Sequence, residues 1–537
     1  MINNKRFRLR IIIPSFPNYN IYTFAASITT SVGPIYVATS ASKLDNWDVE
    51  VIDENNLHGK FYPRTKNKKI DHYQLQKERP ADVVGFYGSI SSTVPRLYKL
   101  AKMYKKMGAK TIAGGKHVES LPEEALNNNV DVVAFSEGEI TIRDLLLTWE
   151  KNDSLDNVNG IAFLKNKKMH QTEKRELIHD FDKLPYPDFN LLRYAKIKYY
   201  PINRTRGCNS RCEFCAVKEK ARCSTPQRMI NQVKYLVETR NAKFFFEASD
   251  HFAANREEAV EFCELLTKFQ KDYKKKLVFT VQTRITDARY PELLKAMKDA
   301  NISTVCIGYE SPIDEELLAM KKGYISKDLV KWTEDFHRHK FYIHGMFIFG
   351  YPKKTNDLTI IPLKERVKRF QYFIKKAKID TVQVLITIPL PGTELRERLQ
   401  KENRLYPLNK IGWEYYDGQY PLFQPDDSIS PEEIQQAVHR LMGKFYHFEN
   451  FWKLVNNILF HFPRIVFFAA LTIIFGKIKY VTNAFKLWYR KYFRNYSIRF
   501  GGHIVVKNWN KNFKKDTFID KLQQAKSEVL KKYNFVK

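Results

Sequence analysis

The sequence predicts an α/β fold in three parts: an N-terminal doubly wound, Rossmann-like domain, a partial (β/α)6 barrel of the TIM type, and an α-helical C-terminal extension. Two observations predict it. Short apolar runs alternate with stretches of helical spacing in two successive series, and the last part of the chain then becomes basic and aromatic. We place the domains at residues 1–150, 196–430 and 431–537, with a linker at 151–195. At 537 residues the chain is long enough for each domain to bury its own core.

The first domain is expected to contain a parallel sheet. A helix predicted over residues 94–107 ends at Gly108, a typical C-cap, and separates two of the predicted strands. Ligands of such sheets bind beyond the carboxyl ends of the strands, where paired glycines let a bulky ligand approach the backbone. Ordinary βα turns are the alternative explanation for these glycines. The strands are predicted at 8–13, 49–52, 83–87, 111–113 and 130–135, and the binding candidates that follow them are Ser89, Gly114, Gly115 and Glu137.

The linker should carry a small hairpin, residues 160–164 and 168–172. Beyond it, six β/α units follow in series, which by the right-handed crossover rule predicts a partial barrel with its chemistry at the carboxyl ends of the strands. Three cysteines directly follow the first of these strands. The predicted strands are 199–205, 243–247, 277–282, 304–309, 342–349 and 381–388.

Cys208, Cys212 and Cys215 have the spacing C-x3-C-x2-C. Three thiolates on so short a loop can bind three irons of a 4Fe-4S cluster and leave the fourth iron without a protein ligand. A zinc site completed by Cys223 is the alternative, and three unrelated buried cysteines are a weaker one. The chain has six cysteines in all, with three of them in eight residues, a poor layout for disulfides, so we expect a reducing, cytosolic setting.

The stretch 204–215, RTRGCNSRCEFC, resembles the cluster loop of the radical S-adenosylmethionine (SAM) superfamily, with Phe214 at its aromatic position. Further similarity follows in the order expected of that superfamily and covers roughly residues 196–400. It includes 244–250, which resembles the acidic motif after the second strand, IGYES at 307–311, residues 345–352, and PLPGT at 389–393.

This resemblance implies that SAM chelates the open iron and that one electron from the cluster cleaves it to methionine and a 5′-deoxyadenosyl radical. It also implies residue roles. Phe214 would flank the adenine, Glu310 would bind the ribose hydroxyls, and Arg284 would pair with the SAM carboxylate, while Glu247 belongs to the acidic motif. A surface salt bridge for Arg284 and a structural cap for Glu310 are the alternatives.

The first domain resembles the cobalamin-binding domain that precedes the barrel in one class of these enzymes. The similarity lies in Gly114–Gly115 with 121–124 after it, and in SEGE at 136–139. An Asp-x-His-x-x-Gly loop is missing from the first 150 residues, so cobalamin is expected without a histidine ligand, and His58 and His117 are predicted to be surface residues. Some relatives have lost the cofactor. No cysteine precedes Cys208, which argues against the methylthiotransferases, and none follows Cys306, which argues against an auxiliary-cluster domain.

Charge is concentrated at the end of the chain. Lys and Arg number 90 against 59 acids, a net +31, and residues 444–537 hold 19 Lys/Arg and 4 acids, a net +15. The apolar run 465–475 is shorter than the about 20 residues that span a bilayer. With 451–462 before it and basic, aromatic residues to 494 after it, it predicts a helical hairpin in an anionic membrane interface. A helical cap that buries its apolar faces on the barrel is the alternative. Near the N-terminus, the apolar run 11–13 is too short for a signal peptide, so export is not expected.

These observations predict a cytoplasmic radical SAM enzyme that uses a 4Fe-4S cluster, SAM and cobalamin, with peripheral contact to the inner face of the membrane. Methyl transfer to an unactivated carbon of a lipid-like or natural-product substrate is the first expectation, and cyclisation or rearrangement is the next. A one-electron reductant such as flavodoxin or ferredoxin is the expected partner, and nucleic acid is not. The alternatives are a radical SAM enzyme without cobalamin and a zinc-binding scaffold without turnover.

Overall fold

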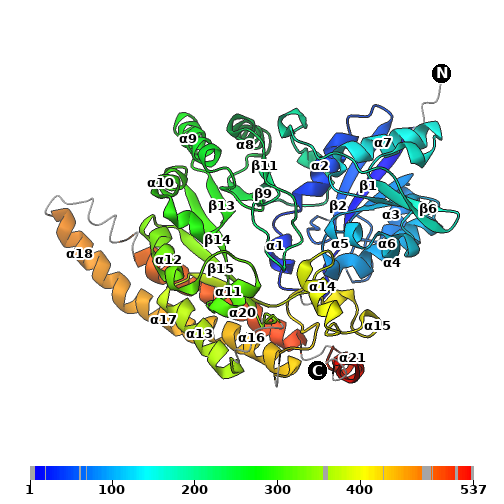
Figure 1. Ribbon diagram of the computed structural model, residues 1–537. Coiled ribbons are helices and arrows are strands. Elements are labelled where there is room, and N and C mark those ends of the chain that lie inside the picture. Colours follow the sequence, from blue (N-terminus) through cyan, green and yellow to red (C-terminus); the bar gives the residue numbers. More distant parts are fainter. Residues whose placement is uncertain are drawn as a thin grey trace.

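The computed structural model describes residues 6–474, apart from positions 19, 60–61, 68, 355–360 and 427–428, and then residues 485, 488–513 and 518–533. Two sheets stand side by side, and a helical extension runs along the second (Figure 1). The fold is α/β, as the sequence predicts.

The N-terminal sheet is doubly wound. Its strands run in the order β7-β6-β5-β4-β3-β1-β2-β8. The order of strand addition therefore reverses at β1, since β2 lies on one side of it and β3 on the other. On one face of the sheet, Ile35 and Ile142 pack in one buried cluster with Leu9 and Ile11. Leu97 belongs to a second buried cluster on the other face. The parallel strands are β1 (Phe7–Ile13), β2 (Trp47–Asp53), β3 (Val83–Tyr87), β4 (Lys110–Gly114) and β5 (Val132–Ala134); the helices are α1 (Thr23–Ala26), α2 (Val32–Ala41), α3 (His72–Glu78), α4 (Val94–Lys106), α5 (Lys116–Ser120), α6 (Pro122–Asn127) and α7 (Gly138–Lys151).

The stretch predicted as a linker completes this sheet. The predicted hairpin is present as β6 (Ile161–Lys165) and β7 (Lys168–Gln171), and β6 pairs antiparallel with β5. At the opposite edge β8 (Leu192–Arg193) pairs with β2. Ile161 and Ala162 are fully buried, and a free linker would leave both exposed to water.

The second sheet is an open barrel of six parallel strands in sequence order, from β9 to β16. In the described part of the chain β9 and β16 do not pair with each other, so the barrel is partial, as predicted. Its strands are β9 (Tyr199–Ile202), β12 (Phe244–Glu247), β13 (Val278–Thr283), β14 (Ile302–Glu310), β15 (Tyr342–Phe349) and β16 (Thr381–Ile386); its helices are α8 (Pro226–Arg240), α9 (Arg256–Asp272), α10 (Pro291–Asp299), α11 (Asp314–Ala319), α12 (Leu329–Arg338), α13 (Leu363–Lys376), α14 (Glu394–Lys401) and α15 (Leu408–Ile411).

The C-terminal extension is helical, as predicted. A helical segment, Pro431–Leu471, combines α16 (Pro431–Phe445), a turn at 446–448, α17 (Glu449–Asn456), a π-helical turn (Asn457–His461) and the start of α18 (Phe462–Ile474). A second π-helical turn (Tyr489–Arg494) leads into α20 (Asn495–Phe513), which returns along α17, and α21 (Phe518–Tyr533) follows. The two arms of the predicted hairpin meet where Phe462 packs on Trp488, with ring centroids 4.9 Å apart. Residues 475–484 of the prediction lie outside the described residues.

Candidate active site between the two domains

The three cysteines lie on a loop whose ends are tied together. β10 (Thr205–Arg206) pairs antiparallel with β11 (Arg222–Cys223), which closes the loop at its base. Gly207 opens the loop with a φ of 85°, and a Cβ at this position would lie 2.7 Å from the carbonyl oxygen of Glu219. The Gly207 N–H donates to the Asp250 carboxylate (2.9 Å), and the Cys208 N–H donates to the Glu219 carbonyl (3.0 Å). Backbone conformation and hydrogen bonds therefore fix the ends of this loop.

The thiols are half-buried at the carboxyl end of the barrel. Burial raises the pKa of both Cys212 and Cys215, while Lys322 opposes the shift at Cys212 and the Val217 N–H opposes it at Cys215. Among the described residues no three His, Cys, Asp or Glu side chains lie close enough together to hold a single metal ion. A 4Fe-4S cluster binds each thiolate to a different iron, so it suits more widely separated sulfurs than a tetrahedral zinc ion does.

Cys223 is the fourth ligand that the zinc alternative needs, but it lies at the base of the loop. Its Sγ contacts the Thr205 hydroxyl at 3.3 Å, in the short β10–β11 pair. The position of Cys223 at the base of the loop therefore favours the cluster over a zinc site.

Glu247 lies beneath the loop and has no exposed surface. It accepts hydrogen bonds from the Arg204 backbone N–H (3.0 Å) and from the Ser249 hydroxyl. Arg204 is itself buried and pairs with Glu258 at 2.8 Å. The structure thus places Glu247 against the strand that leads into the cysteine loop, with one carboxylate oxygen, Oε2, that accepts no hydrogen bond from any described residue.

The three residues expected to bind SAM come together around a lysine that sequence reasoning missed. Lys322 Nζ lies 3.0 Å from Glu310 Oε1 and 5.8 Å from the centroid of the Phe214 ring. Arg284 donates to the Lys322 carbonyl (3.2 Å) and to the Ser210 hydroxyl inside the cysteine loop (2.5 Å). Lys322 follows α11 in a segment without a recognisable motif, so its position depends on the tertiary fold alone.

Local backbone geometry directs Glu310 into this cluster. The register between β14 and β15 shifts between Gly308 and Glu310, and Glu310 has a φ of 62°, which is unusual for a residue with a side chain. Its carboxylate occupies the space beside Gly308, where a Cβ would stand. Burial alone would lower the pKa of Lys322, but Glu310, with Tyr324 and Cys212, raises it above its usual value. The ammonium group is therefore charged and faces the cysteine loop.

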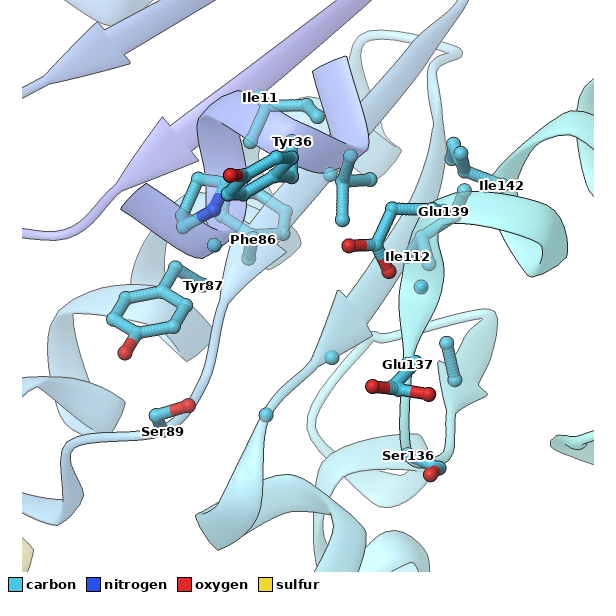
Figure 2. Close-up of a pocket in the computed structure, with 18 of the residues that line it drawn as sticks. Ile11, Tyr36, Phe86, Tyr87, Ser89, Ile112, Ser136, Glu137, Glu139 and Ile142 are labelled. Carbon is cyan, nitrogen blue, oxygen red and sulfur yellow. The ribbon is translucent and has the colours of Figure 1, made fainter. Parts of the chain in front are cut away.

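The four predicted residues of the first domain line one cavity, of about 380 Å³, at the carboxyl edge of the sheet. Figure 2 shows Tyr87 and Ser89 on one side of it and Glu137 and Glu139 on the other. Most of its lining is apolar, and Asn203 and Arg206 from the base of the cysteine loop also reach it. A second cavity, of about 420 Å³, shares Tyr87 and Ser89 with the first and extends to Tyr416 beyond the barrel.

The glycines keep this edge open. Gly115 has a φ of 125°, and a Cβ there would lie 2.7 Å from the Ser89 nitrogen. Gly114 ends β4 next to it, and Gly85 also lines the cavity. A large ligand could thus contact the backbone directly, and the apolar depth, the glycines and Ser89 fit the cobalamin expected from the sequence.

Glu137 has a second role that its motif did not reveal. Its carboxylate pairs with Arg206 and Arg222, each at 3.0 Å, and these two arginines lie on the two strands that close the cysteine loop. Glu139 also pairs with Arg206. Although burial would raise the pKa of Glu137, Arg222 and Arg206 lower it, so the group stays anionic. On the other side of the loop Lys116 pairs with Glu219 at 2.5 Å. Ion pairs therefore fasten the loop to the first domain from two sides.

The histidines differ from the prediction in one case. His58 is exposed, as predicted. His117 is only 2% exposed, so its prediction as a surface residue is wrong. Its ring stands edge-on to Trp413 at 4.5 Å and its Nδ1 contacts the Ser91 hydroxyl at 2.9 Å, because the segment after the barrel covers α5. That segment is more than 250 residues away in the sequence, so no local pattern could have revealed the contact.

Comparison with known proteins identifies both domains. Residues 202–359 match the radical SAM superfamily, and residues 23–146 match the B12-binding domain. The first match contains all three loop cysteines together with Arg284 and Glu310, and the second contains Ser89, Gly114, Gly115 and Glu137.

Relatives of this chain are named as methyltransferases or as a cyclase. An uncharacterized methyltransferase of Pyrococcus horikoshii is 27% identical over 392 residues, which are 70% of this chain and 81% of that protein. The anaerobic magnesium-protoporphyrin IX monomethyl ester cyclase of Cereibacter sphaeroides is 23% identical over 368 residues, 66% of this chain and 56% of the cyclase. Among solved structures, the cobalamin-dependent SAM radical enzyme OxsB, with aqua-cobalamin and SAM bound, superposes with a TM-score of 0.62 at 15% identity, covering 95% of this chain and 84% of its own.

The fold and the site thus define a radical SAM enzyme. More particularly, the chain is a radical SAM enzyme with an N-terminal B12-binding domain, and its cofactors are a 4Fe-4S cluster, SAM and cobalamin.

Proposed function

We propose that this enzyme transfers a methyl group to an unactivated carbon of a lipid-like or other apolar substrate. One observation supports the proposal above the others. Asn203 and Arg206, at the base of the cysteine loop, line the same cavity as Gly114 and Gly115. The sites for the two cofactors therefore adjoin across one interface, which is the arrangement that a reaction needing both requires.

The cofactors carry the difficult chemistry: when bound, the reduced cluster supplies the electron that cleaves SAM, and cobalamin carries the methyl group. The residues of this chain bind and orient them. Cys208, Cys212 and Cys215 hold the cluster, while Arg284 and Lys322 present positive charge to the SAM carboxylate. Glu310 accepts hydrogen bonds from hydroxyl groups of the ribose, and Phe214 contacts the adenine.

The proposed reductant is a flavodoxin or a ferredoxin. Arg211, Lys218 and Lys220 are exposed on the cysteine loop, close to the thiols that would hold the cluster. A basic surface at this position complements an acidic electron carrier and speeds encounter with it. The enzyme is proposed to work on the cytoplasmic side of the membrane, and the unpaired thiols agree with a reducing compartment.

The proposal is tested with full-length protein purified anaerobically from cells supplied with cobalamin. We expect corrinoid absorption, a cluster signal in electron paramagnetic resonance after reduction, and release of 5′-deoxyadenosine from SAM. Methyl transfer predicts that label from the SAM methyl group appears in the product.

Product without label would favour ring closure, the second candidate, which the similarity to the cyclase supports. Protein that holds neither cluster nor corrinoid under these conditions would overturn the proposal. Zinc in place of iron would favour the scaffold instead.

A further inference from the structure

The hairpin formed by α17, α18 and α20 carries an apolar surface exposed to solvent. Leu459, Phe460 and Phe467 are 59%, 62% and 64% exposed, and Trp452 is 57% exposed. Val466, Phe468 and Leu471 of α18 are exposed as well, at 49%, 65% and 39%, so large apolar side chains face solvent along the described length of this helix. Figure 1 shows α18 extending away from the barrel.

This surface is unlike that of a soluble protein. The helical segment Pro431–Leu471 has an 18-residue window with a mean hydropathy of 1.5, of which only 6% is buried. Soluble monomers seldom expose a contiguous apolar patch of this kind, and a helix that is apolar on most of its faces needs an apolar environment. The barrel does not supply it, because the helix leaves the barrel after α16.

The base of the hairpin is firmly attached. The Val382 N–H donates to the Tyr446 hydroxyl (3.0 Å), which in turn donates to the Val382 carbonyl (2.8 Å). Arg499 of α20 donates to the Ile379 carbonyl (3.1 Å). Phe451 packs on Phe500 with ring centroids 5.1 Å apart, which joins α17 to α20. The barrel thus holds the hairpin at the amino end of β16, and the described apolar tip projects from it.

The charges around this apolar surface indicate what it binds. Residues 444–515 hold fourteen Lys and Arg and a single acid, Glu449. Of the described basic residues, Lys453, Arg464 and Lys507 are exposed beside or along the apolar faces. Trp452 and Tyr489, 57% and 47% exposed, are of the type that concentrates at the boundary between water and lipid. Apolar side chains bordered by cations match an anionic bilayer, whereas nucleic acid would leave the phenylalanines in water.

We propose that this hairpin anchors the enzyme to the surface of an anionic lipid bilayer, with Leu459, Phe460, Val466 and Phe467 inserted among the acyl chains. By length and composition alone, the helical segment Pro431–Leu471 could also cross a bilayer, and the proposal places its apolar side chains in one leaflet. The anchor deepens the proposed function, since it would bring the enzyme to a lipid-like substrate, but it depends on none of the cofactor-binding residues.

The test uses the full-length, cluster-loaded protein and two kinds of vesicle, one of phosphatidylcholine alone and one of equal parts phosphatidylcholine and phosphatidylglycerol. We expect the protein to sediment with the anionic vesicles and about tenfold more weakly with the neutral ones. The triple variant Phe460→Glu, Val466→Glu and Phe467→Glu should lose this binding while its thermal unfolding midpoint and its SAM cleavage in solution stay unchanged, because the three side chains are not buried.

The matched control is Tyr372→Glu on α13, where the side chain is 65% exposed and lies outside the hairpin. It should bind anionic vesicles as the unchanged protein does. Binding that survives the triple substitution, or no vesicle binding by the unchanged protein, overturns the proposal. The proposal is also overturned if the only effect of the triple substitution is to convert a dimer to a monomer, or to abolish binding to RNA. SAM cleavage measured in parallel reports on the proposed reaction separately.

Discussion

Glu137 and Arg222 lie 3.0 Å apart across the boundary between the B12-binding domain and the radical SAM barrel. With Arg206 on the neighbouring strand, they connect the edge of one cofactor cavity to the base of the loop for the other. The side chains of Glu137 and Arg222 are each 12% exposed, so water screens this pair only in part.

Replacing Glu137 by Gln should therefore loosen the cysteine loop. Removing the Glu137 charge leaves Arg222 largely buried without its counter-charge, while Arg206 keeps Glu139, and the change should cost about 2 kcal/mol of unfolding free energy. Hydrogen exchange should rise in residues 205–223. Asp144→Asn, which breaks the more exposed pair with Arg175, is the control and should have little effect. If the losses of unfolding free energy caused by Glu137→Gln and Arg222→Met simply add in the double variant, the two residues are not coupled.

Single alanine substitutions at Cys208, Cys212 and Cys215 should each abolish the cluster signal and most of the bound iron. Cys223→Ala should retain both, because Cys223 contacts Thr205 at the base of the loop. Iron and zinc analysis of the four anaerobically prepared variants provides the measurement. Loss of metal from Cys223→Ala, with zinc in the parent protein, would restore the zinc alternative.

Lys322→Met should weaken SAM binding while the cluster stays intact. The substitution removes a buried positive charge and leaves Glu310 without its partner, so the dissociation constant for SAM should rise about tenfold to a hundredfold. The change that SAM produces in the cluster's resonance spectrum measures binding directly. The neighbouring Lys321→Met is the control, since Lys321 is 46% exposed and pairs with Glu394 instead. Equal SAM affinity in both variants would remove Lys322 from the site.

Gly115→Ala should exclude cobalamin. The added methyl group would meet Ser89, and the φ of 125° is unfavourable for any residue with a side chain. We expect corrinoid absorption to disappear from purified protein, with the iron content retained. Gly108→Ala is the control: Gly108 also has a positive φ, 86°, but a Cβ there meets no atom within 4 Å and lies outside the cavity. Corrinoid lost equally from both variants would indicate a general effect on folding.

Glu54 makes the stability of the first domain dependent on pH. Burial would raise its pKa, but hydrogen bonds and ion pairs with His72 and Arg96 lower it from 4.5 to about 2. Since the folded pKa is depressed, its stabilisation is present above the unfolded pKa and is lost as the pH falls from about 4.5 to about 2. Glu54→Gln should thus cost about 3 kcal/mol near neutral pH and much less near about pH 3, in urea unfolding. Asp48→Asn, at the more exposed pair with Arg8, is the control. A cost that does not change with pH would contradict the assignment.

Most of the fold could be predicted because apolar periodicity is local. Each of the six barrel strands was predicted to within a few residues, since a buried parallel strand reads as a short apolar run between turns. The edges of the first sheet could not be assigned this way. The sequence predicts the hairpin of β6 and β7 but places it in a linker, because its pairing with β5 is a long-range contact.

The candidate site likewise contains residues that local motifs reveal and residues that only the tertiary structure reveals. The cysteine spacing, the glycines after β4 and the IGYES segment are contiguous motifs, and they located the cluster loop, the cavity and Glu310. Lys322, Arg206 and the buried His117 belong to no such motif. Each acquires its environment from residues distant in the chain.

By itself, the sequence determined which chemistry this protein carries, because the ligands of a cluster and the turns that cradle a cofactor are written in adjacent residues. Only the tertiary structure decided how the two cofactor sites face each other, which charges hold them together, and where the apolar hairpin projects. Those features depend on the packing of segments far apart in the chain, and local patterns of hydrophobicity and charge carry no information about that packing.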